Sequence, residues 1–211
     1  MAISRSLSFR QLTAIFTSLS RDSRPWRLRR TLQSDNPSDI NGELRGIASF
    51  VPLRSSVSTQ DIVYKEEGEL PMAGLKWTKK YIWRLDGGGN SGENGGISVW
   101  FVKKPDEEEE EADYLFHQFE FGVQEAQEEE SSATLVVPPT PPLPWGADEG
   151  TVVMAHGNHL CINDMYRTAY SFRIQPTTGE VVSWASRHVV KGPKKNQDIV
   201  NLYDLEGGLG S

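Results

Sequence analysis

Long apolar runs and paired cysteines are what this sequence lacks. No apolar run approaches the roughly 20 residues that a transmembrane helix needs, so we expect no membrane-spanning helix and no membrane partner. The only cysteine, Cys161, excludes an intramolecular disulfide and favours a reducing compartment. The composition therefore predicts a cytoplasmic protein.

Basic residues are missing from one segment. Residues 106–130 hold 12 of the 29 acidic residues and no Lys or Arg, which leaves 17 acidic against 22 basic residues elsewhere. The folded body is thus mildly basic, although the chain has a net charge of -7. A nucleic-acid binder would cluster Lys and Arg with aromatic residues in a recognisable module, and none is legible, so we expect no nucleic-acid partner.

Phosphate-binding and metal-binding motifs are also missing. Gly87-Gly88-Gly89 lacks the following helix and the lysine of a phosphate-binding loop, so no cofactor is expected. His159 and Cys161 are potential zinc ligands, but no second Cys/His pair has matching spacing, so we predict no metal. Cys161 beside His159 has the composition of a nucleophilic pair. A lone cysteine, however, is more often an inert buried residue.

The chain does have enough apolar surface for a core. Hydrophobic residues make up 37% of its 211 residues and include six tryptophans, which suits a single domain. Residues 1–30 carry seven arginines and one acidic residue, a composition that also suits a mitochondrial transit peptide. The alternative is an amphipathic helix over residues 9–19, which would plug or flank the end of a barrel.

After residue 24 the apolar period changes from about 3.6 to 2. This alternation, between turn-forming residues, predicts ten strands: 26–32, 42–51, 61–67, 75–85, 97–102, 114–121, 151–159, 166–174, 181–190 and 199–205. Sequential short strands with turn-length connections favour a meander, and closure removes its exposed edges. We therefore predict an all-β fold: a closed antiparallel up-and-down barrel of about ten strands with a short N-terminal helix.

The domain organisation follows from the interruptions of this pattern. We expect an N-terminal segment over 1–24, one barrel domain over 25–206 with flexible insertions, and a disordered tail over 207–211; the insertions are 86–96, 105–113 and 124–150. The third contains a proline run from Pro138 to Pro144. Such a run is either a polyproline ligand for an SH3 or WW domain, and hence a protein-partner site, or a stiff solvated excursion.

Two strands carry the side chains that we expect inside the barrel. Alternation places Trp77, Tyr81 and Trp83 on one face of strand 75–85, where they either fill the interior or line a ligand cavity. Tyr64 and Glu66 form a similar pair on strand 61–67, unless both face solvent. An inward Glu is unfavourable unless paired, so its partner would be an Arg, Lys or His across the barrel.

The stretch from His156 to Tyr166 predicts a polar cluster at the mouth of a barrel. His159 and Tyr166 would point inward as hydrogen-bonding groups, and Asp164 occupies a turn position. His117, between Phe116 and Phe119, is more consistent with a core histidine than with a site residue.

Several of these motifs carry a resemblance to known families. Trp26-Arg27-Leu28-Arg29-Arg30 resembles the entry strand of lipocalin-like (calycin) barrels, although Arg24 stands where such strands carry glycine. The resemblance implies that Trp26 closes the barrel base and that Arg187 stacks on it. Other motifs resemble a fungal and bacterial family of unassigned function, domain of unknown function 6314; they begin at Tyr64, Tyr81, Phe116, His159 and Val190. Membership implies one compact barrel with His159, Asp164 and Tyr166 as site residues, and implies no reaction.

Three functions remain open at this point. The first is a binding module for a small apolar or aromatic molecule, oriented by Tyr64, Glu66, His159 and Tyr166 and walled by Trp77, Tyr81, Trp83 and Trp184. The second is a cofactor-independent isomerase, cyclase or dehydratase, with His159 or His117 as acid/base, Asp164 orienting it and Tyr166 as hydrogen-bond donor. The third is an adaptor that binds proteins through its acidic and proline-rich loops.

Overall fold

The computed structural model describes residues 7–21, 24–53, 59–70, 74, 76–87, 95–103, 110–122, 136–144, 150–193 and 195–205. These residues form one helix and eleven strands. In chain order they are α1 (Phe9–Arg21), β1 (Trp26–Ser34), β2 (Gly42–Pro52), β3 (Thr59–Glu69), β4 (Lys76–Asp86), β5 (Gly96–Lys103), β6 (Glu111–Gln118), β7 (Glu120–Phe121), β8 (Thr151–Cys161), β9 (Asp164–Ile174), β10 (Val181–Lys191) and β11 (Asn196–Leu205). Each of the ten predicted strands is present, because β6 and β7 together occupy the predicted strand 114–121.

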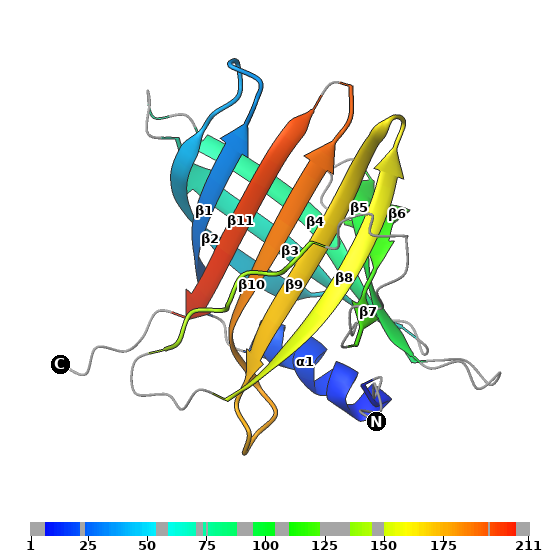
Figure 1. Ribbon diagram of the computed structural model, residues 1–211. Helices are drawn as coiled ribbons and strands as arrows, with labels where there is room; N and C mark the ends of the chain where they lie inside the picture. Colours follow the sequence, from blue (N-terminus) through cyan, green and yellow to red (C-terminus); the bar gives the residue numbers. More distant parts are fainter. Residues whose placement is uncertain are drawn as a thin grey trace, which may run out of the picture.

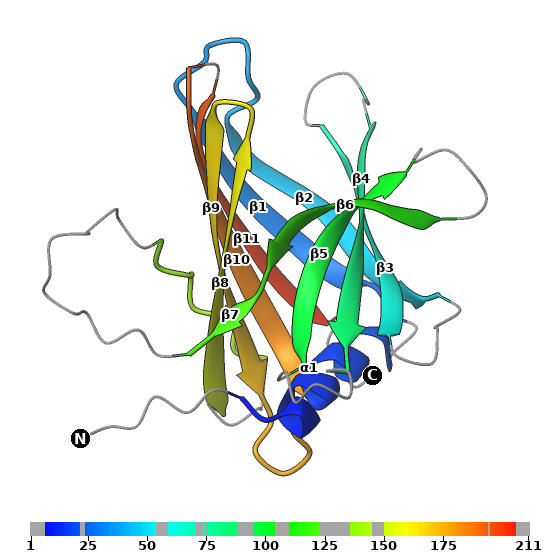
Figure 2. The same ribbon diagram turned by 90° about the vertical axis from the view of Figure 1, so that its right-hand side faces the viewer.

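The strands form one antiparallel sheet that curls into a nearly closed barrel (Figures 1 and 2). The spatial order is β6-β5-β4-β3-β2-β1-β11-β10-β9-β8-β7, so β1 pairs with β11 and the other neighbours follow the chain. Residues 111–121 bring the two edges together, since β6 pairs with β5 and β7 pairs with β8. The predicted up-and-down barrel is therefore confirmed.

Helix α1 covers one end of the barrel (Figure 2). It begins with a capping box, in which the Ser8 amide donates to the Gln11 side chain and the Gln11 amide to the Ser8 hydroxyl. Its apolar face enters the hydrophobic core and consists of Leu12, Ile15, Phe16 and Leu19. The indole Nε1 of Trp26 donates to the Leu19 carbonyl at 3.2 Å. The helix thus plugs the end of the barrel, and we call this end the helix end.

Aromatic rings fill the part of the barrel above the helix. Trp26 and Trp184 pack edge to face with ring centroids 6.5 Å apart, and Trp83 and Trp184 do so at 5.8 Å. Tyr203 stacks on Trp184, with ring centroids 3.5 Å apart. These rings are almost fully buried and anchor one contiguous core. Trp26 therefore closes the base as expected.

Arg187 does not stack on Trp26. It is on the outer face of β10, where its guanidinium forms two hydrogen bonds with Asp198 of β11, at 2.9 and 2.6 Å. The pairing of β10, β11 and β1 places Arg187 opposite Val200, and Val200 opposite Thr31, five residues along β1 from Trp26. The expectation fails because strand alternation directs Arg187 away from the interior.

Residues 136–144, which we call the proline segment, lie on the outer face of β9 and β10 (Figure 1). The Pro139 carbonyl accepts a hydrogen bond from Ser171, and the Pro142 carbonyl accepts one from Ser183. Arg173 donates to the Pro141 carbonyl at 3.0 Å and to the Pro142 carbonyl at 3.3 Å. Pro138 and Pro141 are both buried in this contact, and they are three residues apart, which is the repeat of polyproline II.

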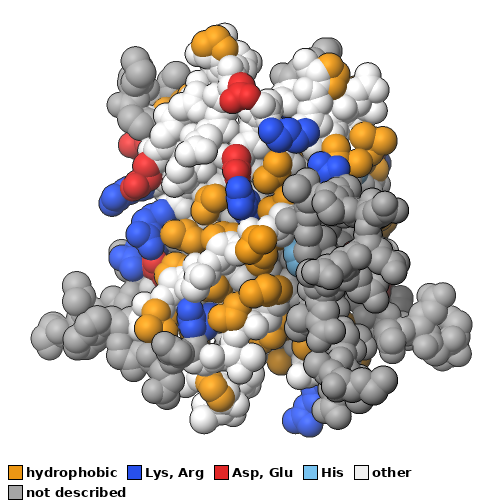
Figure 3. Space-filling view, viewed as in Figure 1, with side chains coloured by type: hydrophobic (Ala, Val, Ile, Leu, Met, Phe, Trp, Pro, Cys, Tyr) orange, Lys and Arg blue, Asp and Glu red, His pale blue; other side chains and the backbone are white. Residues whose placement is uncertain are grey.

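The remainder of the predicted insertions falls mainly outside the described residues. This is so for 88–94, 104–109, 123–135 and 145–149, and for the predicted tail. Strand β6 begins at Glu111, three residues earlier than expected, within the acidic stretch. The outer surface over β1, β11 and β10 mixes hydrophobic with acidic and basic side chains (Figure 3). No helix among the described residues is long and apolar enough to cross a membrane.

Candidate functional site

A cavity of about 240 Å³ lies inside the barrel on the other side of the aromatic core from α1. Trp83, Trp184 and Tyr203 line it toward the helix end. Lys79 and Lys195 line it where their side chains reach solvent. The cavity therefore opens at the end opposite the helix, and Lys79, Tyr166, Lys195 and Gln197 form its mouth.

Strand register assembles the polar wall of the cavity. Arg30 of β1, Asn201 of β11 and Ser186 of β10 lie side by side in one row across three strands. On the facing strands, Tyr64 pairs with Tyr81, and Glu66 pairs with Lys79. Each of these side chains points inward because residues two apart on a strand share a face.

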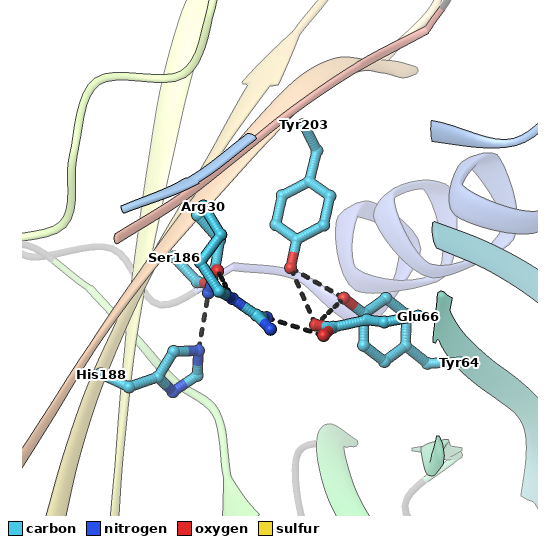
Figure 4. A network of polar contacts seen from close by, with 7 residues as sticks. Arg30, Tyr64, Glu66, Ser186, His188 and Tyr203 are labelled. Carbon is cyan, nitrogen blue, oxygen red and sulfur yellow. Dashed lines mark hydrogen bonds and ion pairs between the residues drawn. The ribbon is translucent and has the colours of Figure 1, made fainter. Parts of the chain in front are cut away.

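Glu66 is the centre of a buried hydrogen-bond network (Figure 4). Arg30 Nη2 lies 2.7 Å from Glu66 Oε2, and both side chains are about 5% exposed. Glu66 Oε1 accepts hydrogen bonds from Tyr64 at 2.5 Å and from Tyr203 at 3.2 Å. The inward Glu66 therefore has the basic partner across the barrel that the sequence predicts.

The network continues from Arg30 to His188. Arg30 Nε donates to Asn201 Oδ1 at 2.6 Å, and Asn201 Nδ2 donates to Ser186 Oγ at 2.9 Å. Ser186 Oγ lies 3.1 Å from His188 Nε2. Burial opposes the charge of Arg30, but the neighbouring Glu66 carboxylate raises the pKa of the guanidinium overall. The ion pair is therefore maintained inside the barrel.

The electrostatics of the site favour neutral phenols and a neutral imidazole. Burial, reinforced by the Glu66 charge, raises the pKa values of Tyr64 and Tyr203 well above 10. Burial and the positive charges of Lys79 and Arg30 lower the pKa of His188 to about 3. Enclosure in the barrel and the charge of Arg30 lower the pKa of Lys79, although its side chain still reaches solvent at the mouth.

Most of the residues expected to bind a ligand line the cavity. These are Tyr64, Glu66, Tyr81, Trp83 and Trp184, together with Tyr166 at the mouth. Trp77 is not part of the wall. Its ring lies against Gly68, and the Arg30 guanidinium sits 4.8 Å from the ring centroid. Trp77 thus supports Arg30 from behind by a cation–π contact.

The residues proposed for acid/base chemistry are dispersed. The His159 ring packs 5.1 Å from Phe116 and 6.2 Å from Tyr166 but does not line the cavity. Asp164 lies against Gly192, and its buried Oδ1 has no hydrogen-bond partner among the residues that the structure describes. No hydrogen bond joins His159 to Asp164 in the described part of the chain.

His117 lies behind the cavity wall. It is 2% exposed, and its Nε2 lies 3.1 Å from the hydroxyl of Tyr170, which does line the cavity. A register shift at Phe116 turns both Phe116 and His117 into the interior, where His117 contacts Gly157. His117 is therefore a core histidine, as its apolar flanks indicate.

Sequence reasoning did not name the other side of the network, namely Arg30, Asn201, Ser186, His188 and Tyr203. A signal for Arg30 was present, because it has the same parity as Trp26 and Leu28 on an alternating strand. Lys79 likewise has the parity of Trp77 and Tyr81, which alternation places on the inward face of their strand. Within the described residues, no group of three His, Cys, Asp or Glu side chains has the arrangement of a metal site.

Comparison with known proteins identifies a family. The model of a family of unknown function (DUF6314) matches residues 23–135 and 142–205, which include every strand of the barrel. No curated protein matches the chain. The matched residues include the whole Glu66 network.

Proposed function

The chain belongs to the family of unknown function DUF6314. Because the family description names no activity, we propose from the barrel itself that the protein binds a small, largely apolar or aromatic molecule in its internal cavity. The observation that carries this proposal is the cavity of about 240 Å³ between an aromatic core and a buried polar network. Sites for small molecules combine apolar walls with a few positioned polar groups in this way.

The size of the cavity limits the ligand. Pockets for drug-sized ligands have roughly 300–1,000 Å³. This cavity is smaller, and its aromatic lining includes Tyr81, Trp83, Phe116 and Trp184. A molecule with one aromatic or branched aliphatic group fits these walls. The rings already pack against one another, so binding does not require them to be reordered.

The geometry gives less support to an enzyme. Within the described residues, no hydrogen bond links His159 to Asp164, the pair predicted for acid/base chemistry. The histidine that does line the cavity is His188, and its pKa is lowered to about 3. A general base works best when its pKa lies near the operating pH. Binding without chemical change therefore accounts better for the arrangement.

The test is native mass spectrometry of the purified protein, followed by denaturation and identification of released molecules. Ile199→Trp, which adds bulk to the cavity wall, is expected to abolish binding. Val200→Trp is the matched control, because Val200 is the next residue on β11 and points outward. Retention of the released molecule by a folded Ile199→Trp variant would place its site elsewhere and refute the proposal.

A further inference from the structure

The charges on the cavity wall do not balance. Arg30, Lys79 and Lys195 are cationic, and Glu66 is the only carboxylate among the described lining residues. Arg30 and Glu66 form an ion pair with each other. Lys79 and Lys195 therefore add two positive charges at the mouth, and Lys195 also interacts with the carboxylates of Asp39 and Asp164 outside the lining.

Lys79 faces Glu66 without binding it. The two residues are register partners on β3 and β4, and both point into the barrel. The Glu66 oxygens, however, already accept hydrogen bonds from Arg30, Tyr64 and Tyr203. Within the described part of the chain, the Lys79 ammonium forms no hydrogen bond or ion pair. The Lys79 ammonium reaches solvent at the mouth, and an anion that approaches it there stabilises its charge.

Lys195 carries a second positive charge at the same opening. Its ammonium donates to the Tyr166 hydroxyl at 2.8 Å and lies 5.5 Å from the centroid of that ring. Neither contact neutralises its charge. The positive charge of Lys195 also reaches Lys79, where it contributes to the lowered pKa of the Lys79 ammonium. The mouth thus holds two positively charged side chains beside an aromatic interior.

We propose that the ligand is a small organic acid, whose anionic group binds between Lys79 and Lys195 while its apolar body contacts Tyr81, Trp83, Phe116 and Trp184. This inference rests on the proposed binding function and specifies the class of ligand. An ammonium ligand would be repelled by the two lysines, and a neutral ligand would leave their charges unpaired. A carboxylate pairs with them and keeps its solvated side toward the mouth.

The experiment compares matched probes that differ only in charge. Indole-3-acetate, indole-3-ethanol and tryptamine share a ring system, as do phenylacetate, 2-phenylethanol and phenethylamine. Their affinities for the full chain are measured by isothermal titration calorimetry at low ionic strength. We expect each acid to bind roughly tenfold or more tightly than its alcohol, and the amine to bind least, because charge-assisted hydrogen bonds are about twice as strong as neutral ones.

Two neighbouring lysines provide the control. Lys79→Met removes the charge but retains most of the apolar stem, and it is expected to abolish the preference for acids. Lys80→Met changes the next residue, which points outward and pairs with Glu110 at 2.8 Å, and it is expected to leave that preference intact. Circular dichroism of both variants verifies that they are folded.

The outcomes separate the two proposals. Alcohols that bind as tightly as acids, or an acid preference that survives in Lys79→Met, would overturn the organic-acid inference and leave the binding function in place. If no probe in either series shows binding that Ile199→Trp abolishes, both proposals fail for ligands of this size.

Discussion

Arg30 and Glu66 form an ion pair across the barrel interior, although their strands, β1 and β3, are separated by β2. The inward residues of β2 near this contact are Gly46 and Ala48, and Ala48 is the register partner of Glu66. Small residues on the intervening strand leave room for the two long side chains to meet. Trp77 from β4 fills the adjacent space over Gly68. The ion pair thus depends on four strands: β1 and β3 supply the two long side chains, β2 supplies small residues between them, and β4 supplies Trp77.

Breaking this pair is expected to destabilise the fold strongly. Glu66→Gln leaves the Arg30 charge buried without its counterion, and we expect a loss of about 3–5 kcal/mol in the free energy of unfolding. Arg27→Met is the matched control, because Arg27 pairs with Asp204 on the outer face of β1 and its side chain is 54% exposed. An exposed pair contributes about 0–1 kcal/mol. Urea denaturation checks both values. A loss in Glu66→Gln as small as that in Arg27→Met would show that the Glu66 network is not needed for stability.

The sequence predicts the strands and their inward faces because alternation is a local property. Alternation places Tyr81 and Trp83 inside from their own strand and leaves Tyr64 and Glu66 either inside or facing solvent; in the structure all four line the cavity. The basic partner of Glu66 was expected as a type of residue. Its identity as Arg30 depends on which strands the closed barrel brings together, and local alternation does not determine this.

Two features of the structure depart from the alternation of inward and outward residues along a strand. The register shift at Phe116 turns two consecutive residues inward, whereas alternation allows only one, so His117 could be placed only by its apolar flanks. The proline segment has no apolar alternation, and its docking depends on donors from β9 and β10, more than 25 residues away. Such contacts are tertiary and leave no periodic signal in the sequence.

Gly46 is expected to tolerate no side chain. A Cβ atom there would clash with the backbone carbonyl of Glu67 on the neighbouring strand, which cannot shift without disturbing the sheet. We expect Gly46→Ala to destabilise the protein by about 1–3 kcal/mol, the range for overpacking. Gly96→Ala is the control, because no atom lies within 4 Å of the position of its Cβ. Thermal unfolding measures both variants, and a neutral Gly46→Ala would contradict this packing argument.

The proline segment is expected to detach when its main donor is removed. Arg173→Ala removes the bonds to the Pro141 and Pro142 carbonyls, and hydrogen bonds of charged groups contribute roughly 1.5–3 kcal/mol. Limited proteolysis within residues 136–144 should therefore be faster in Arg173→Ala than in the native protein. Arg167→Ala, near the other end of β9, is the control and should leave the cleavage rate unchanged.

The same variant bears on the adaptor hypothesis. A proline-recognising partner needs the edge that Pro138 and Pro141 bury against the barrel. If such a domain reads this segment, it should bind Arg173→Ala more tightly than the native chain, because less free energy is needed to displace the segment. Equal binding to both proteins would place the contact elsewhere.

The buried histidines predict a loss of stability in acid. Burial, with the charges of His188 and His159, lowers the pKa of His117 to about 3, and the pKa of His188 is lowered equally. In the unfolded chain both titrate near 6.5. Between these two values the unfolded state binds more protons than the folded state, so the stability present above about pH 6.5 falls as the pH is lowered toward 3.

Each histidine is expected to contribute up to about 1.4 kcal/mol per pH unit within that window. Urea denaturation at pH 7, 6 and 5 measures this slope in the native protein. The double variant His117→Gln/His188→Gln should have a smaller slope whatever its stability at pH 7, because glutamine does not titrate. The slope, and not the absolute stability, therefore separates protonation from lost packing. An unchanged slope in the double variant would mean that other groups take up the protons.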